Sequence, residues 1–63
     1  MKIGDILLFL KGIEESWGLG VLLDQWHTEH DQIHKVYFPK QRIELLYTEV
    51  ELTDNTINIS KRS

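Results

Sequence analysis

Short apolar runs separated by turn-forming residues are the feature that most limits how this chain can fold. The runs occupy residues 6–10, 19–26, 34–38, 42–47 and 50–53. Gly12 and Gly18 lie between the first two runs, and Pro39 ends the third. Runs of about four to eight residues with such boundaries are typical of β-strands, because proline cannot donate a hydrogen bond within a sheet. The pattern therefore predicts five short strands.

The chain has 63 residues and no cysteine, so a small core must hold it without disulfides. A domain of this size buries only about 60% of the surface that its unfolded chain exposes. A sheet that closes on itself buries a core economically and protects its edges. We therefore expect an all-β fold: a small, five-stranded, strongly bent antiparallel barrel over residues 1–53, with a short C-terminal tail over residues 54–63.

Two segments leave alternatives open. Residues 41–52 also carry apolar side chains at helical spacing, so the alternative fold is a small α+β one with a helix there. In the barrel, Thr48-Glu49 instead forms a single 3₁₀ turn between the last two strands. Residues 56–60 of the tail alternate as a strand does, and a further alternative is that they add a strand.

Successive side chains of a strand point to opposite faces, so the runs predict an inner and an outer set. The expected core comprises Leu7, Phe9, Val21, Leu23, Val36 and Phe38. The opposite face then carries the apolar residues Leu8, Leu10, Leu22, Trp26 and Leu46. Either barrel curvature buries these outer side chains, or they form an exposed patch that binds a protein, including a second copy of the chain.

The formal net charge is −3, from 7 basic and 10 acidic residues. Nucleic-acid-binding domains usually present a basic face, because phosphate contacts supply much of their affinity. Basic residues gather here only in residues 34–42 and in the tail. Nucleic-acid binding, as an alternative function, would use Lys35, Lys40 and Arg42, with Tyr37 stacking on a base.

Three histidines, His27, His30 and His34, lie close in sequence to Glu29 and Asp31. Imidazoles bind zinc, but this spacing matches no zinc motif, and a polar, solvent-exposed loop is the preferred interpretation. We expect no bound metal and no cofactor. We also expect no catalytic residues and no enzyme activity, because so short a chain leaves little room for both a core and a water-excluding cleft.

The chain carries no sign of a membrane segment. Its longest uninterrupted apolar run covers only residues 6–10, whereas a membrane-spanning helix needs about 20 residues. The N-terminal segment also lacks the long apolar stretch and the small-residue cleavage site of a signal peptide. We therefore expect a soluble, cytoplasmic protein with no membrane partner.

Several short motifs resemble those of SH3-like small barrels of the Tudor-like and KOW-like groups. They are Lys2-Ile3-Gly4-Asp5-Ile6-Leu7-Leu8, Trp17-Gly18-Leu19-Gly20-Val21-Leu22 and Val36-Tyr37-Phe38. These groups have a hydrophobic-Gly-Asp-x-Val opening, a Gly-x-Gly-x-Val entry to the second strand and a Val-x-Phe/Tyr third strand. The resemblance covers residues 2–53. It is closest to the C-terminal Tudor-like domains of bacterial DNA helicases and to the polymerase-contacting domains of CarD-type regulators.

The resemblance implies a binding module set among transcription or DNA-processing proteins. Small stand-alone members also occur among phage-encoded proteins, which would place this chain in the host cytoplasm. Tudor domains bind methylated side chains in aromatic cages, and Trp17 and Tyr37 are the candidates here. The preferred interpretation, however, is that Trp17 covers the barrel end as a hydrophobic plug. RNA-binding KOW loops are basic, whereas Glu14-Glu15 make this loop acidic.

The leading hypothesis is a non-catalytic, protein-binding or self-associating adaptor or regulatory module. Its expected contact residues are Leu8, Leu10, Trp17, Leu22, Trp26 and Leu46. One alternative is a nucleic-acid-binding module that uses residues 34–42. The other is a small structural component of a larger, for instance viral, assembly, in which residues 56–60 add a strand to a neighbouring chain.

Overall fold

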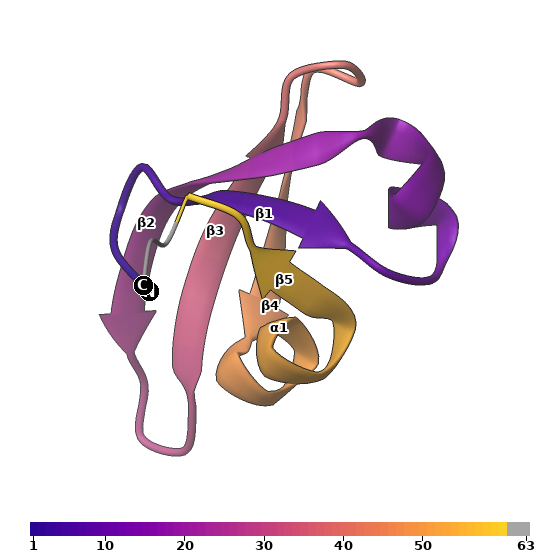
Figure 1. The fold of residues 1–63 in the computed structure, drawn as a ribbon. Helices are drawn as coiled ribbons and strands as arrows, with labels where there is room; N and C mark the ends of the chain where they lie inside the picture. Colours follow the sequence, from indigo (N-terminus) through magenta and orange to yellow (C-terminus); the bar gives the residue numbers. More distant parts are fainter. Residues whose placement is uncertain (61–63) are drawn as a thin grey trace.

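The computed structural model, which describes residues 1–60, contains one five-stranded antiparallel sheet and a single short α-helix (Figure 1). The strands are β1 (Ile6–Phe9), β2 (Leu19–His27), β3 (Gln32–Phe38), β4 (Ile43–Thr48) and β5 (Thr56–Asn58). A 3₁₀ helix, η1 (Ile13–Trp17), joins β1 to β2, and the α-helix α1 (Glu49–Asn55) joins β4 to β5. The all-β prediction is confirmed. Residues 61–63 of the expected tail lie outside the described residues.

The fifth strand lies in the segment that was expected to be a tail. β5 pairs with β1, with Leu8 opposite Ile57, and the strand order across the sheet is β4-β3-β2-β1-β5. Two backbone bonds extend this pairing, because the Leu10 N–H donates to the Asn55 carbonyl (2.8 Å) and the Ile59 N–H donates to the Ile6 carbonyl (2.9 Å). Within residues 1–60 the outermost strands β4 and β5 are not paired, and α1 lies between them.

The prediction of a strand over residues 50–53 is wrong, since these residues lie in α1. Thr48 ends β4 and caps the helix: its side chain accepts from the Glu51 N–H (3.3 Å), and the Glu51 carboxylate accepts from the Thr48 N–H (2.9 Å). This reciprocal capping box satisfies helix-end donors and starts the helix. The prediction of a 3₁₀ turn at Thr48-Glu49 is therefore wrong as well. So is the alternative prediction of a helix over residues 41–52, because β4 occupies most of that segment.

The core lies on the concave side of the curved sheet and is closed by one residue of α1. Its buried side chains are Leu7, Phe9, Leu22, Val36, Phe38 and Leu52. The Phe38 ring lies 5.2 Å from Phe9 and 5.0 Å from Trp17, the latter edge-on, which is a favourable aromatic geometry. Four of the six expected core residues are confirmed.

The two wrong core predictions, Val21 and Leu23, come from the phase of β2. Leu7 pairs with Gly20, so the inward positions of β2 are Gly20 and Leu22 rather than their neighbours. Val21 is half-buried on the other face, and Leu23, 39% exposed, occupies a β-bulge. An apolar run such as Val21-Leu22-Leu23 does not show which of its residues faces inward.

Candidate interaction surface

Three neighbouring strands carry an exposed row of aliphatic side chains. Leu8 of β1 is paired with Leu19 of β2 on one side and with Ile57 of β5 on the other. Directly paired residues of adjacent strands point to the same face. The exposed fractions are 36% for Leu8, 40% for Leu19 and 49% for Ile57. An apolar row therefore crosses β5, β1 and β2 on the side away from the core.

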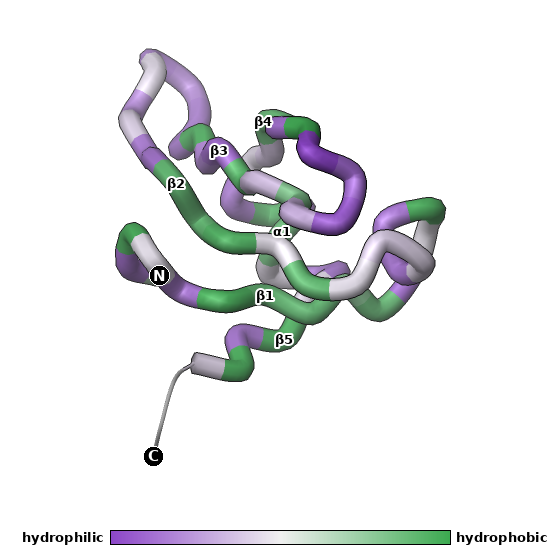
Figure 2. The backbone as a smooth tube through the Cα atoms, turned by 90° about the horizontal axis from the view of Figure 1, so that it is seen from above, coloured by the Kyte–Doolittle hydropathy of each residue, from purple (hydrophilic) through white to green (hydrophobic). Residues whose placement is uncertain are grey.

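A second row runs beside the first. Ile6 pairs with Val21, and Ile59 is bonded through its N–H to the Ile6 carbonyl. Ile6 and Val21 are half-buried, Ile59 is 47% exposed, and Leu10, just beyond β1, is 46% exposed. We call the two rows with Leu10 the outer apolar face; its members are Ile6, Leu8, Leu10, Leu19, Val21, Ile57 and Ile59. The tube coloured by hydropathy shows β1 as an apolar stretch and the first half of β2 as apolar apart from one near-white segment (Figure 2).

The structure places only two of the six expected contact residues, Leu8 and Leu10, on this face. Trp26 and Leu46 are also exposed, but they lie elsewhere: Trp26 pairs with Ile33, and Leu46 pairs with Lys35, beyond the bulge in β2. Trp26 lies in the second half of β2, which pairs with β3 and not with β1, and Leu46 lies on β4, at the opposite edge of the sheet from β5.

The other two expected contact residues point inward. Leu22 is fully buried, because it pairs with Val36 on the core side, so its predicted exposure is wrong. Trp17 is half-buried with its ring edge-on against Phe38, as the plug interpretation predicts. Tyr37 precedes Phe38 in β3 and so faces the opposite side of the sheet, and the alternative cage of Trp17 and Tyr37 is not formed.

Sequence reasoning missed five of the seven members of the outer apolar face, and it placed one of them, Val21, in the core; the five are Ile6, Val21, Leu19, Ile57 and Ile59. The alternation of residues 56–60 was the available signal for the last two, because it is the pattern of a strand with one apolar side. The sequence contains no signal for the outward direction of Leu19, because its neighbours Gly18 and Gly20 have no side chains to show an alternation. The two glycines mark only the start of the strand. Gly18 has a φ of +80°, and a Cβ on Gly20 would lie 2.6 Å from Val36 Cγ1.

The residues expected to bind nucleic acid come from two different elements. Lys35 and Tyr37 alternate on the outer side of β3, but Lys35 Nζ lies 3.9 Å from Glu44 Oε1 of the neighbouring strand, which partly neutralises it. Lys40 and Arg42 lie in the turn between β3 and β4. The expected nucleic-acid-binding residues thus divide between a strand and a turn.

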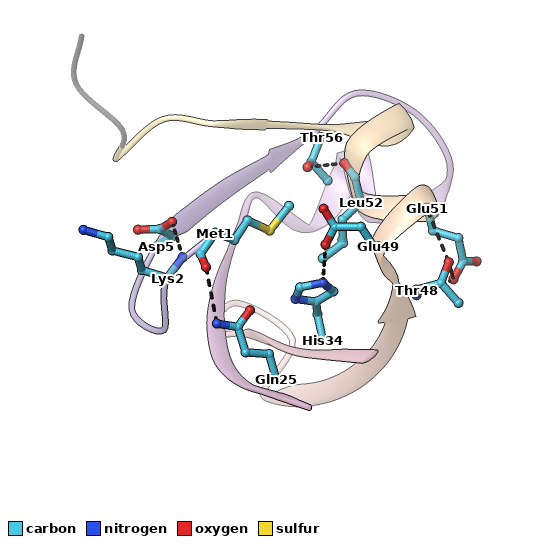
Figure 3. A network of polar contacts seen from close by, with 10 residues as sticks. All are labelled: Met1, Lys2, Asp5, Gln25, His34, Thr48, Glu49, Glu51, Leu52 and Thr56. Carbon is cyan, nitrogen blue, oxygen red and sulfur yellow. Dashed lines mark hydrogen bonds and ion pairs between the residues drawn. The ribbon is translucent and has the colours of Figure 1, made fainter. Parts of the chain in front are cut away.

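The three histidines lie in different environments. His34 is 1% exposed, and its Nε2 lies 2.6 Å from Glu49 Oε1 of α1 (Figure 3). His30 is exposed in the turn between β2 and β3, and His27 is exposed at the end of β2. Among residues 1–60, no three histidine or acidic side chains come together in a way that could hold a metal ion.

One polar contact attaches η1 to the sheet. The Tyr47 hydroxyl donates to Glu14 Oε2 at 2.9 Å. Burial raises the pKa of the Tyr47 hydroxyl well above its ordinary value, and the hydrogen bond and negative charge of Glu14 raise it further. The phenol is therefore a hydrogen-bond donor at neutral pH, and it holds the acidic loop against β4.

In comparisons with known proteins, no protein-family model, curated protein or solved structure matched the chain. No helix in residues 1–60 has the length and apolar character needed to cross a membrane. Function must therefore be inferred from the surface of the chain itself.

Proposed function

We propose that the protein is a non-catalytic protein-binding module and that the outer apolar face is its contact surface, with a second copy of the chain as the partner. The observation that carries this proposal is the row of Leu19, Leu8 and Ile57. Three aliphatic side chains at directly paired positions, each more than one-third exposed, form a contiguous patch. Contiguous apolar patches on small soluble proteins are typical of protein contacts.

The chemistry of the face supports a second copy as the partner. The two rows on β5, β1 and β2 consist of leucine, isoleucine and valine, and burying them against an equally aliphatic surface is favourable. Two copies related by a two-fold axis could bury these rows against each other, which is the commonest oligomer symmetry. A standard interface covers about 800 Å² per partner, which is roughly a fifth of the 4479 Å² surface of this chain. The face extends over three of the five strands, β5, β1 and β2.

Sedimentation velocity over a range of concentrations tests this proposal. We expect the mass to rise from 7.5 kDa towards twice that value as the concentration increases. Ile57→Lys and Leu19→Lys should each weaken self-association by at least about tenfold, since each places a charge in the buried patch. Leu46→Lys is the matched control, because Leu46 is 56% exposed but lies outside the face. Circular dichroism verifies that each variant is folded.

A chain that stays monomeric at all accessible concentrations would contradict self-association. So would an equal loss of self-association in the Leu46→Lys control. If a monomeric chain instead binds another protein, and Ile57→Lys abolishes that binding while Leu46→Lys does not, the face remains the contact surface but its partner differs.

The resemblance to SH3-like modules supports a binding role, and the position of the fifth strand beside the first is compatible with such a barrel. The adaptor role in transcription or DNA processing rests on that resemblance alone. The basic residues are the weaker candidate surface, because Lys35 has an acidic neighbour in Glu44. Strand addition by residues 56–60 to a neighbour is not proposed, because residues 56–58 already pair with β1 of their own chain.

A further inference from the structure

Two buried polar atoms face the interior without a hydrogen-bond partner among the described residues. They are Nδ1 of His34, on β3, and Oε1 of Gln25, on β2. His34 and Gln25 are directly paired across the two strands, so both side chains point to the same, inner side of the sheet. Figure 3 shows the amide of Gln25 beside the ring of His34. The two residues are neighbours on this side of the sheet, and no hydrogen bond joins these two atoms.

In neutral His34, the contact with Glu49 decides which ring nitrogen is the acceptor. His34 Nε2 lies 2.6 Å from Glu49 Oε1, and an ionised carboxylate only accepts hydrogen bonds. In a neutral imidazole one nitrogen carries the hydrogen and the other has a lone pair. The hydrogen of neutral His34 therefore lies on Nε2, and Nδ1 is left as an acceptor.

The Gln25 amide is oriented in a similar way. Its Nε2 donates to the Met1 carbonyl oxygen at 3.3 Å. A carbonyl cannot donate, so the amide nitrogen must face Met1 and the amide oxygen must face inward. Gln25 Oε1 is therefore a second acceptor, and two acceptors cannot satisfy each other.

The β-bulge at Leu23 explains why an amide stands opposite His34. Leu22 pairs with Val36, whereas the next pair is Asp24 with Lys35, so Leu23 is one extra residue in β2. With an unbroken register, Asp24 would pair with His34. The bulge replaces that carboxylate with the amide of Gln25, which costs less to bury than a charged group.

We propose that His34 Nδ1 and Gln25 Oε1 form a binding site for one internal water molecule. Water has two O–H donors, and it can give one to each acceptor; buried waters usually satisfy such otherwise unpaired groups. The result is a continuous chain of hydrogen bonds from the Met1 carbonyl through Gln25, the water and His34 to Glu49. This chain ties the N-terminal segment and β2 to α1, independently of the outer apolar face.

Nuclear magnetic resonance of the uniformly ¹⁵N-labelled protein at pH 8 tests the site. We expect ¹⁵N shifts and couplings that place the His34 hydrogen on Nε2 and show Nδ1 as a hydrogen-bonded acceptor. We also expect a cross-relaxation peak between His34 Hε1 and water, with the sign of a long-lived bound molecule. His27 and His30, both exposed, are internal controls and should show neither a single tautomer nor long-lived water.

Variants separate the water site from other sources of this peak. Gln25→Met keeps the approximate volume of the side chain and removes the amide oxygen, so the water peak of His34 should be lost while its tautomer is retained by Glu49. Gln41→Met, in the exposed turn after β3, is the matched control and should change neither signal. Tyr47 pairs with His34, so its hydroxyl is another possible source of the water peak. Tyr47→Phe removes this hydroxyl, and the peak should remain intact in that variant.

The proposal fails if wild-type His34 carries its hydrogen on Nδ1, or if His34 Hε1 shows no long-lived water. It also fails if the peak survives unchanged in Gln25→Met. The wild-type spectra decide the question even if that variant does not fold. Monomeric behaviour in sedimentation would leave this proposal untouched, so the two proposals fail separately.

Discussion

At the scale of single residues, the packing of β2 against the core depends on the absence of a side chain at Gly20. Gly20 faces the core opposite Leu7, and an added Cβ would lie 2.6 Å from Val36 Cγ1 and 3.3 Å from Phe38 Cε1. Real Cβ atoms do not come so close to a neighbour, so the core must shift to accept one. Glycine thus lets β2 lie directly on the aromatic core.

We predict that Gly20→Ala lowers the free energy of unfolding by about 1–3 kcal/mol, the usual effect of overpacking a core. Urea denaturation measures this change. The double variant Gly20→Ala, Val36→Ala is the control, because it removes the methyl group that the new Cβ would meet. It should lose less stability than the sum of the two single variants, and strict additivity would show that the contact with Val36 is not the cause.

At the scale of elements, α1 depends on its surroundings. It has seven residues, and helices shorter than about 12–15 residues are marginal on their own in water. The capping box of Thr48 and Glu51, the fully buried Leu52 and the bond from His34 to Glu49 hold it in place. This helix positions β5, and through β5 it positions Ile57 on the outer apolar face.

Loss of the cap should therefore destabilise the whole fold. We predict that Thr48→Ala lowers the free energy of unfolding by about 1 kcal/mol, whereas Thr48→Ser, which keeps the hydroxyl, has a much smaller effect. Thr53→Ala, at an exposed position within α1, is the control and should change stability by less than about 0.5 kcal/mol. Equal effects at positions 48 and 53 would mean that helix propensity, rather than the cap, is responsible.

At the scale of the whole molecule, Asp5 joins the two ends of the described chain. Its carboxylate accepts from the Lys2 N–H (2.8 Å), from Asn58 Nδ2 (2.7 Å) and from Ser60 Oγ (3.2 Å). The bond from the Lys2 backbone, followed by that from Asn58, lowers the pKa of Asp5 below its ordinary value of 3.8. The charged carboxylate thus connects the turn before β1 to the end of β5.

The sign of the pH effect follows from this lowered pKa. The stabilisation is fully present well above pH 3.8, the value in the unfolded chain, and is lost as the pH falls through the lower folded value. We predict that the stability difference between wild type and Asp5→Asn shrinks as the pH falls from 5 to 2, as measured by urea denaturation. Asp31→Asn, at an exposed turn, should show no such trend. A constant difference for Asp5→Asn would contradict the prediction.

The sequence predicted four of the strands to within two residues at each end, because their apolar runs are bounded by glycine, proline or polar turns. It also contained the signal for α1, since Thr48 and Glu51 have the spacing of a capping box. That signal was outweighed by the short apolar pattern of Val50 and Leu52. Local pattern alone does not separate a short helix from a short strand.

What local sequence determined was the all-β class and the alternation of faces along β1 and β3, since side-chain direction in a strand follows from its two-residue period. What only the tertiary structure decided was which face of β2 is inner, where β5 pairs, and which apolar residues share one surface. These depend on the register between strands and on the bulge at Leu23. Pairing joins residues far apart in the chain, as Leu8 and Ile57 are, and no local pattern encodes their distance in space.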